Sequence, residues 1–194
     1  MYNSRIAKRI LIVLGLALSA ALVVGFEGRP VWGDPTGRVW YYGELVPFGT
    51  LLDRGIEPHC HDVLGKGITC YDSNEELAAA TGCDLPGVDT AAVEHLLATG
   101  AVSPIQPALA CYAVVYDAIN YGGRNFCLEY DYNDFRAIYF NDITSSIYIP
   151  SGAGYSRYYA AINYSGDSRA FASSVPDLRS YNFNDVISSA RRGY

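Results

Sequence analysis

Positive charge is scarce in this sequence. Its 194 residues include 14 lysines and arginines against 20 aspartates and glutamates, and every acidic residue lies after residue 25. If the first 25 residues are removed, 11 basic and 20 acidic residues remain, a net charge of −9. Because this balance repels a phosphate backbone, we expect no nucleic-acid partner. It favours a protein that attracts cations.

Recognisable catalytic motifs are also missing. The chain contains no HExxH, Walker loop, GxGxxG or nucleophile elbow. The stretch His59-Cys60-His61 has no CxxC or HxxxH beside it, so it lacks the spacing of a four-ligand zinc site. We interpret this stretch as a loop that carries a disulfide cysteine. On these grounds we predict that the protein is not an enzyme.

A long hydrophobic run is absent as well. Residues 10–24 are apolar and uncharged, but 15 residues are few for a spanning helix. They follow Arg5, Lys8 and Arg9 and precede small residues, which is typical of an export signal. We predict a signal peptide over residues 1–25, with an uncleaved anchor as the alternative. If it is uncleaved, this segment would be the only membrane contact. Both interpretations predict a secreted protein or one on the extracytoplasmic surface.

Five cysteines are expected to pair in such an oxidising compartment, and the odd count leaves one thiol or one intermolecular bond. Cys111 and Cys127 flank a predicted hairpin symmetrically, so we predict a disulfide between them. Cys60, Cys70 and Cys83 allow three single pairings, and the sequence does not choose among these.

Pro104 and Pro107 divide the chain into an acidic, loop-rich region, residues 26–104, and a second domain, residues 105–194. The first is predicted to be a small α+β region, with a strand at residues 38–42 and two short helices. One helix should begin after Ser73, whose capping box pairs it with Glu76, and end at Gly82. The other should span residues 91–99, capped by Thr90 and stopped by Gly100.

The second domain contains a duplication. Residues 116–146 align without a gap onto residues 159–189, with 13 identities in 31 positions. Two copies of this length suggest a duplicated supersecondary unit and not a solenoid, which needs three or more repeats. Residues 112–194 also hold 13 of the 17 tyrosines, in short alternating runs that predict antiparallel strands.

Each repeat opens with an aromatic-x4-Tyr-x-Gly hairpin and closes with Asn-Asp-x-x-Ser-Ser. The hairpin glycine permits a backbone turn that other residues resist. The closing loops, residues 141–146 and 184–189, offer carboxylate, amide, hydroxyl and carbonyl oxygens, the ligands that Ca²⁺ takes in sets of six to eight. Asx and serine side chains also cap loops without any metal, which is the structural alternative.

These two motifs resemble those of the βγ-crystallin family, over about residues 111–190. The resemblance implies a mostly β fold, a sandwich of two Greek keys. It also implies two Ca²⁺ sites, each built from the loop of one motif and a serine of the other. The ligand candidates carried over are Asn141, Asp142, Ser145, Asn184, Asp185 and Ser188. The last serines, Ser146 and Ser189, would hold the loops by hydrogen bonds.

On this resemblance we predict a secreted, non-enzymatic Ca²⁺-binding module with a structural or cell-surface role, its partners being calcium ions and an extracellular protein or cell-surface component. The alternative is a secreted protease inhibitor or toxin-like protein of the same fold. One departure concerns the second hairpin, which has Ser165-Gly-Asp-Ser where the first has Gly122-Gly-Arg-Asn.

Overall fold

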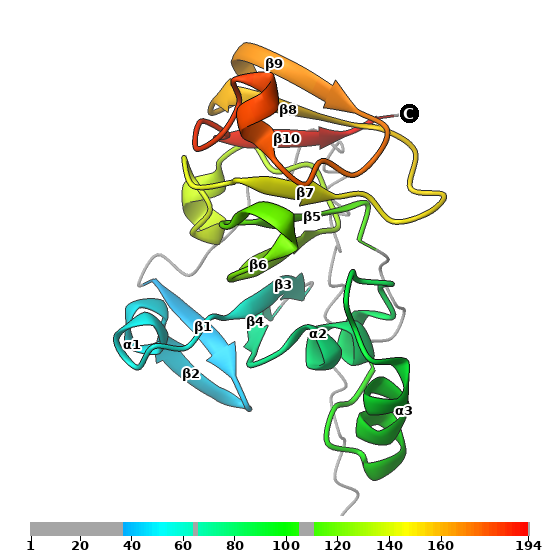
Figure 1. The fold of residues 1–194 in the computed structure, drawn as a ribbon. Helices are drawn as coiled ribbons and strands as arrows, with labels where there is room; N and C mark the ends of the chain where they lie inside the picture. The colour runs from blue at the N-terminus through cyan, green and yellow to red at the C-terminus, as the bar shows by residue number, and fades with distance from the viewer. Residues whose placement is uncertain (1–36, 64–65, 105–110, 194) are drawn as a thin grey trace, which may run out of the picture.

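The computed structural model describes residues 37–63, 66–104 and 111–193. The predicted signal segment and most of the proline linker lie outside these ranges. Below, the N-terminal region means residues 37–104 and the duplicated domain means residues 111–193. Figure 1 shows the two stacked, with the N-terminal region in blue to green and the duplicated domain in green to red.

Two β-sheets make up most of the structure. The larger has seven strands in the order β2-β1-β4-β3-β6-β5-β7, and the smaller has three in the order β10-β8-β9. The bounds of the strands in the larger sheet are β1 Arg38–Tyr41, β2 Glu44–Pro47, β3 His59–Val63, β4 Gly67–Tyr71, β5 Ala113–Tyr116, β6 Asn125–Leu128 and β7 Ser146–Tyr148. Those in the smaller sheet are β8 Ser156–Ala161, β9 Ser165–Phe171 and β10 Ser189–Arg192.

The two repeats of the duplicated domain exchange short segments between the sheets. Tyr132, from the first repeat, bridges Ala190 in β10, while Val175, from the second repeat, bridges Ile147 in β7. Paired backbone hydrogen bonds of 2.7–2.9 Å close both bridges. Each repeat therefore contributes three strands to its own sheet and one segment to the other, which confirms the predicted pair of Greek keys.

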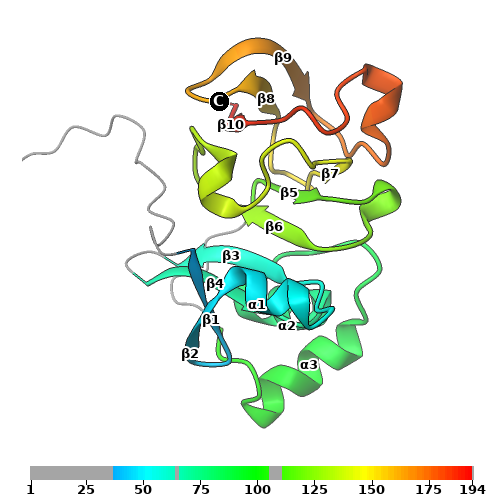
Figure 2. The same ribbon diagram turned by 90° about the vertical axis from the view of Figure 1, so that its left-hand side faces the viewer.

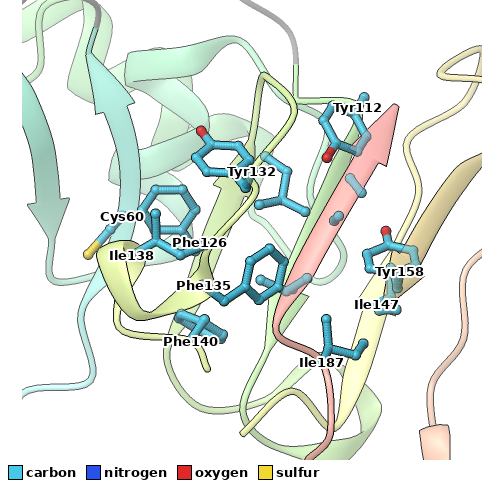
Figure 3. Packing of buried hydrophobic residues seen from close by; sticks show 14 of the residues in the cluster. Cys60, Tyr112, Phe126, Tyr132, Phe135, Ile138, Phe140, Ile147, Tyr158 and Ile187 are labelled. Carbon is cyan, nitrogen blue, oxygen red and sulfur yellow. The ribbon is translucent and has the colours of Figure 1, made fainter. Parts of the chain in front are cut away.

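The core fills the space between these sheets. Figure 3 shows Phe126, Tyr132, Phe135, Tyr158 and Ile187 converging there. Phe140 and Phe183, at equivalent positions of the two repeats, are 2% and 1% exposed. Burying a side chain of this size contributes roughly 1.5–3 kcal/mol. The internal repeat therefore places matched aromatic residues on both sides of one shared core.

The N-terminal region extends the larger sheet. Strand β3 runs parallel to β6, with Cys60 opposite Phe126 and His61 opposite Cys127. Cys60 also belongs to the core cluster of the duplicated domain, and Figure 3 shows it beside Phe126 and Ile138. The sheet thus crosses the predicted division near residue 105. The prediction of a loop at His59–His61 was wrong, because these residues form a central, buried strand.

Three α-helices belong to this region: α1 Phe48–Asp53, α2 Asn74–Thr81 and α3 Thr90–Thr99. Helix α2 is confirmed in detail, since Ser73 Oγ accepts a hydrogen bond from Glu76 N at 3.2 Å and Gly82 ends the helix in the left-handed conformation. Helix α3 begins one residue earlier than predicted, because Asp89 is the cap. Helix α1 lies where we expected loops and short strands.

Helix α3 lies at the end of the molecule opposite β8–β10 in both views (Figures 1 and 2). Within the described ranges, no helix has the length and apolarity that crossing a membrane requires.

Two disulfides reinforce the larger sheet. Cys111 and Cys127 are bonded as predicted, across the start of the duplicated domain. Cys60 and Cys70 are directly opposite each other on β3 and β4, and they form the second bond. Cys83 is left as a free, buried thiol. The structure thus resolves the three pairings that the sequence left open.

Candidate metal centre

The two candidate loops are built by the same local interactions. Each follows a short 3₁₀ helix, η2 Phe135–Ile138 or η3 Leu178–Tyr181. An aspartate caps each of these helices and pairs with an arginine two residues later, Asp134 with Arg136 and Asp177 with Arg179. The chain then turns, and residues 141–146 and 184–189 follow. The duplication therefore reproduces the approach to the loop as well as the loop itself.

The aspartate of each loop occupies a left-handed backbone conformation. Its φ angle is 56° at Asp142 and 54° at Asp185, a region that aspartate and asparagine tolerate better than most residues. The backbone N–H of each aspartate is bound by the opposite repeat. Asp142 donates to Ile187 O and Asp185 donates to Thr144 O, each at 3.0 Å. These bonds fix where each carboxylate points.

Each carboxylate meets a serine of the other repeat. The hydroxyl of Ser188 lies 3.0 Å from Asp142 Oδ1, and the hydroxyl of Ser145 lies 3.2 Å from Asp185 Oδ1. Two oxygens that share an ion at about 2.4 Å lie about 3 Å apart when they are neighbouring ligands. The structure therefore brings the predicted residues together in two reciprocal groups, Asn141-Asp142 with Ser188 and Asn184-Asp185 with Ser145.

The asparagines complete the polar surface of each group. Nδ2 of Asn141 donates to Asp142 Oδ2 at 2.6 Å, and Nδ2 of Asn184 donates to Asp185 Oδ2 at 2.5 Å. These bonds occupy one carboxylate oxygen and leave the other toward the serine. Oδ1 of Asn184 is buried and has no hydrogen-bond partner. Such an orphaned oxygen is costly to bury, unless a cation or water meets it.

The hydroxyl proton of Ser188 has two acceptors. Its oxygen lies 3.0 Å from Asp142 Oδ1 and 3.3 Å from the backbone oxygen of Ala160. One proton serves one acceptor at a time, and donation to Ala160 leaves the lone pairs of the hydroxyl facing the carboxylate. Two facing oxygens without a proton between them suit a cation. The oxygens around Ser188 are therefore of the kind that Ca²⁺ takes as ligands.

The last serine of each motif has a different task. Ser146 Oγ donates to Ala118 O at 2.7 Å and accepts from Tyr121 N at 3.1 Å. Ser189 makes the equivalent bonds, to Ala161 O at 2.7 Å and from Tyr164 N at 3.1 Å. Both serines are fully buried. They fasten the hairpin to the loop, as predicted.

Burial and charge limit what each group can do. The two serines are 7% and 5% exposed, whereas the aspartates are exposed, so solvent reaches one side of each group. Each group has one carboxylate, and the nearby Arg136 and Arg179 are already paired with aspartates of their own. Affinity for Ca²⁺ rises with the number of charged ligands. We therefore expect water to complete the coordination and the affinity to be modest.

Sequence reasoning identified the side chains of these groups but not their backbone partners. Ala160, Thr144 and Ile187 contribute carbonyl oxygens, which every residue type has. The sequence marks them only by position, since Thr144 and Ile187 each precede a Ser-Ser pair and Ala160 follows the opening Tyr159.

The sequence also contains no signal for Glu129, whose side chain is 4% exposed and lies 3.2 Å from His61 Nδ1.

No protein-family profile and no curated protein matches the sequence. Among solved structures, the chain is similar to a βγ-crystallin from Ciona intestinalis, with 26% identity, 42% of this chain and 98% of that chain covered, and a TM-score of 0.39.

Two microbial structures are similar over the same share of the chain. A βγ-crystallin from an archaeon is 29% identical, covering 42% of this chain and 95% of that one, with a TM-score of 0.36. A βγ-crystallin domain from Flavobacterium johnsoniae is 33% identical, covering 41% of this chain and 91% of that one, with a TM-score of 0.37. Each match thus takes in almost a whole domain and about two-fifths of this chain.

Proposed function

The chain belongs, through its duplicated domain, to the βγ-crystallin family, and from this premise we propose that it binds two Ca²⁺ ions at its two reciprocal loops. One site consists of Asn141, Asp142 and Ser188, and the other of Asn184, Asp185 and Ser145. The observation that carries the proposal is the pair of cross-repeat contacts, Ser188 to Asp142 at 3.0 Å and Ser145 to Asp185 at 3.2 Å.

Binding at these sites would join the two repeats. Each site takes its carboxylate from one repeat and its hydroxyl from the other, so an ion is held fully only when both repeats are folded and packed. A bound Ca²⁺ ion would place a positive charge between the facing carboxylate and hydroxyl oxygens. Ligand binding to the folded state alone stabilises it by about 2.7 kcal/mol at a hundredfold excess over Kd. The proposed role is therefore a Ca²⁺-stabilised structural module.

We place this module outside the cytoplasm. Two disulfides support this location, because such bonds persist mainly in oxidising compartments. The net negative charge of the chain suits attraction of cations there. Fractionation of cells that express the full chain, with the protein found in the medium or at the surface, tests the location. Recovery in the cytoplasm with reduced cysteines would contradict it.

Calorimetric titration of the full chain with Ca²⁺ tests the sites. We expect two sites in the parent protein and one in each of the variants Ser145→Arg and Ser188→Arg, because the added cation occupies the place of the ion. Ser151→Arg, in an exposed loop away from both groups, is the matched control and should keep two sites. Two sites in either ligand variant, or none in the parent, would refute the assignment.

A further inference from the structure

Three sulfur atoms meet at the junction of the N-terminal region and the duplicated domain. The Sγ atoms of Cys83, Cys111 and Cys127 all lie within 4.8 Å of one another. Cys83 follows helix α2, Cys111 precedes β5 and Cys127 lies in β6. Cys111 and Cys127 are bonded to each other, while Cys83 is a free thiol that is 7% exposed.

The thiol of Cys83 is held against the disulfide. It packs in one apolar cluster with Leu77, Leu85 and both disulfide cysteines. Its sulfur also receives a hydrogen bond from the backbone of Cys111. Helix α2 ends at the left-handed Gly82, and this turn directs the next residue, Cys83, into the cluster. The local fold therefore holds the free thiol beside the Cys111–Cys127 bond.

A buried acid and a buried imidazole lie beside the same bond. Glu129 Oε1 is 3.8 Å from Cys127 Sγ and 3.2 Å from His61 Nδ1. The side chains of Glu129 and His61 are 4% and 1% exposed. The His61–Glu129 contact also ties β3 to the end of β6, a structural role that any exchange chemistry would share. The disulfide thus has a free thiol, a carboxyl group and an imidazole in its immediate surroundings.

We propose that Cys83, Cys111 and Cys127 form a thiol–disulfide exchange site, in which the bond moves from Cys111–Cys127 to Cys83–Cys111. The Cys83 thiolate attacks Cys111 Sγ, and the new bond forms as the Cys111–Cys127 bond breaks. The electron pair of the broken bond leaves on Cys127. The proton lost by Cys83 is balanced by the proton that the Cys127 thiolate takes up, so the exchange releases no net proton.

This exchange needs no oxidant or reductant. One disulfide and one thiol exist before it and after it. The bonded cysteines are 16 positions apart in Cys111–Cys127 and 28 positions apart in Cys83–Cys111. The difference in loop-closure entropy therefore changes the equilibrium constant of the exchange by a factor of only about two. The alternative bond has a distinct effect, because Cys83–Cys111 ties the helical part of the N-terminal region directly to the first strand of the duplicated domain.

Burial sets the speed of this exchange. Desolvation raises the pKa of the Cys83 thiol to about 12, and the thiolate is the attacking species. The titratable groups that face it are Asp84, Glu129, Tyr116 and Tyr148. The pKa values of both tyrosines are raised by burial, so neither becomes charged below pH 10. Exchange should accelerate about tenfold per pH unit between pH 7 and pH 9.

Mapping of the free thiol tests the proposal in the full, unreduced chain. The protein is incubated at pH 7, 8 and 9, quenched in acid, labelled with N-ethylmaleimide under denaturing conditions and digested. We expect the label on Cys83 at first and increasingly on Cys127 with time, at a rate independent of protein concentration. Label that stays wholly on Cys83 at pH 9, or a rate proportional to concentration, would overturn the proposal.

A pair of variants tests the geometry separately. In Cys127→Ser we expect the folded protein to carry a Cys83–Cys111 disulfide and no free thiol. In Cys83→Ser, the matched control, Cys111–Cys127 should remain and no thiol should be labelled. Two free thiols in folded Cys127→Ser, its fold checked by circular dichroism, would show that the sulfurs cannot bond and would overturn the proposal. The Cys60–Cys70 bond provides an internal reference in every digest.

Discussion

At the scale of single residues, the two adjacent serines of each motif act in different places. Ser145 and Ser188 face an aspartate of the opposite repeat, while Ser146 and Ser189 bind the hairpin of their own repeat. Neighbouring residues in an extended segment point to opposite sides, which separates the two tasks. The Ser-Ser pair thus combines a candidate ligand with a fastening residue.

Loss of the fastening serine should destabilise the fold. In Ser146→Ala, the half-buried Ala118 carbonyl and Tyr121 N–H both lose their partner, and each unsatisfied buried group costs about 1–3 kcal/mol. We expect a fall of about 2–4 kcal/mol in the free energy of unfolding, measured by urea denaturation, and a similar fall for Ser189→Ala. Ser151→Ala, at an exposed position, should change it by less than about 0.5 kcal/mol. Unchanged stability in Ser146→Ala would contradict the assigned role.

His59 should make stability sensitive to mild acid. Its side chain is buried and Nδ1 has no partner, and desolvation lowers its pKa below 6.5 although Asn125 and nearby carboxylates oppose the shift. The unfolded chain therefore takes up this proton first as the pH falls, and the folded state loses stability below about pH 6.5. His59→Gln should flatten the decline between pH 7 and pH 5, whereas the exposed His95→Gln should not. Equal slopes in parent and His59→Gln, from denaturation at each pH, would disprove this.

At the scale of elements, the two hairpins share a backbone but differ in their surroundings. Gly123 and Gly166 both have positive φ, 71° and 75°. A Cβ at Gly123 would collide with the carboxylate of Asp117, which pairs with Arg124. A Cβ at Gly166 would lie 3.3 Å from Ala161 Cβ. The different sequence of the second hairpin, Ser165-Gly-Asp-Ser, therefore changes the side chains around the glycine but leaves the backbone turn the same.

This difference predicts unequal effects of alanine. Left-handed backbone costs a residue with a Cβ roughly 1–2 kcal/mol, which is the whole effect expected for Gly166→Ala. Gly123→Ala must also displace Asp117 from Arg124, a partly buried pair, so we expect a loss of about 2–4 kcal/mol. Thermal and urea unfolding of both variants measure the comparison. A larger loss for Gly166→Ala would show that the Asp117–Arg124 pair does not constrain the first hairpin.

Elements defined by local signals could be predicted from the sequence. The Ser73 capping box, the terminal glycines of two helices and the repeated hairpins all depend on residues a few positions apart. Helix α1 has no capping side chain, and Pro47 precedes it, so its sequence resembled the loops around it. The candidate sites were predictable because the duplication aligned Asp142 with Asp185 and Ser145 with Ser188. Their backbone carbonyl partners have no residue signature.

At the scale of the whole molecule, the parallel pairing of β3 with β6 joins the N-terminal region to the duplicated domain. Neither strand shows its partner in its own sequence, because the pairing depends on residues 66 positions apart, such as His59 and Asn125. The burial of Cys83 depends on the same junction. These features therefore could not be predicted from local patterns, and the His59–His61 strand was misread as a loop.

Because the two regions share a sheet and a core, we expect residues 105–194 to be less stable alone than within the full chain. Removing β3 exposes the edge of β6, and it removes Val39, Phe48, Leu51 and Cys60 from the shared core. We expect the excised domain to melt at least about 8 °C below the full chain, the shift that about 2 kcal/mol produces at this size. Calorimetry should show the full chain unfolding in one transition. Equal melting temperatures, or two separate transitions in the full chain, would show that the regions are independent.

The most direct test of the central claim is the number of Ca²⁺ sites in crossed double variants, counted by calorimetric titration. If each ion is shared between repeats, Asp142→Asn with Ser188→Arg damages one site twice and leaves the other intact. Asp142→Asn with Ser145→Arg damages both sites. We predict one remaining site in the first double variant and none in the second. The reverse result, or equal counts in the two variants, would contradict reciprocal binding.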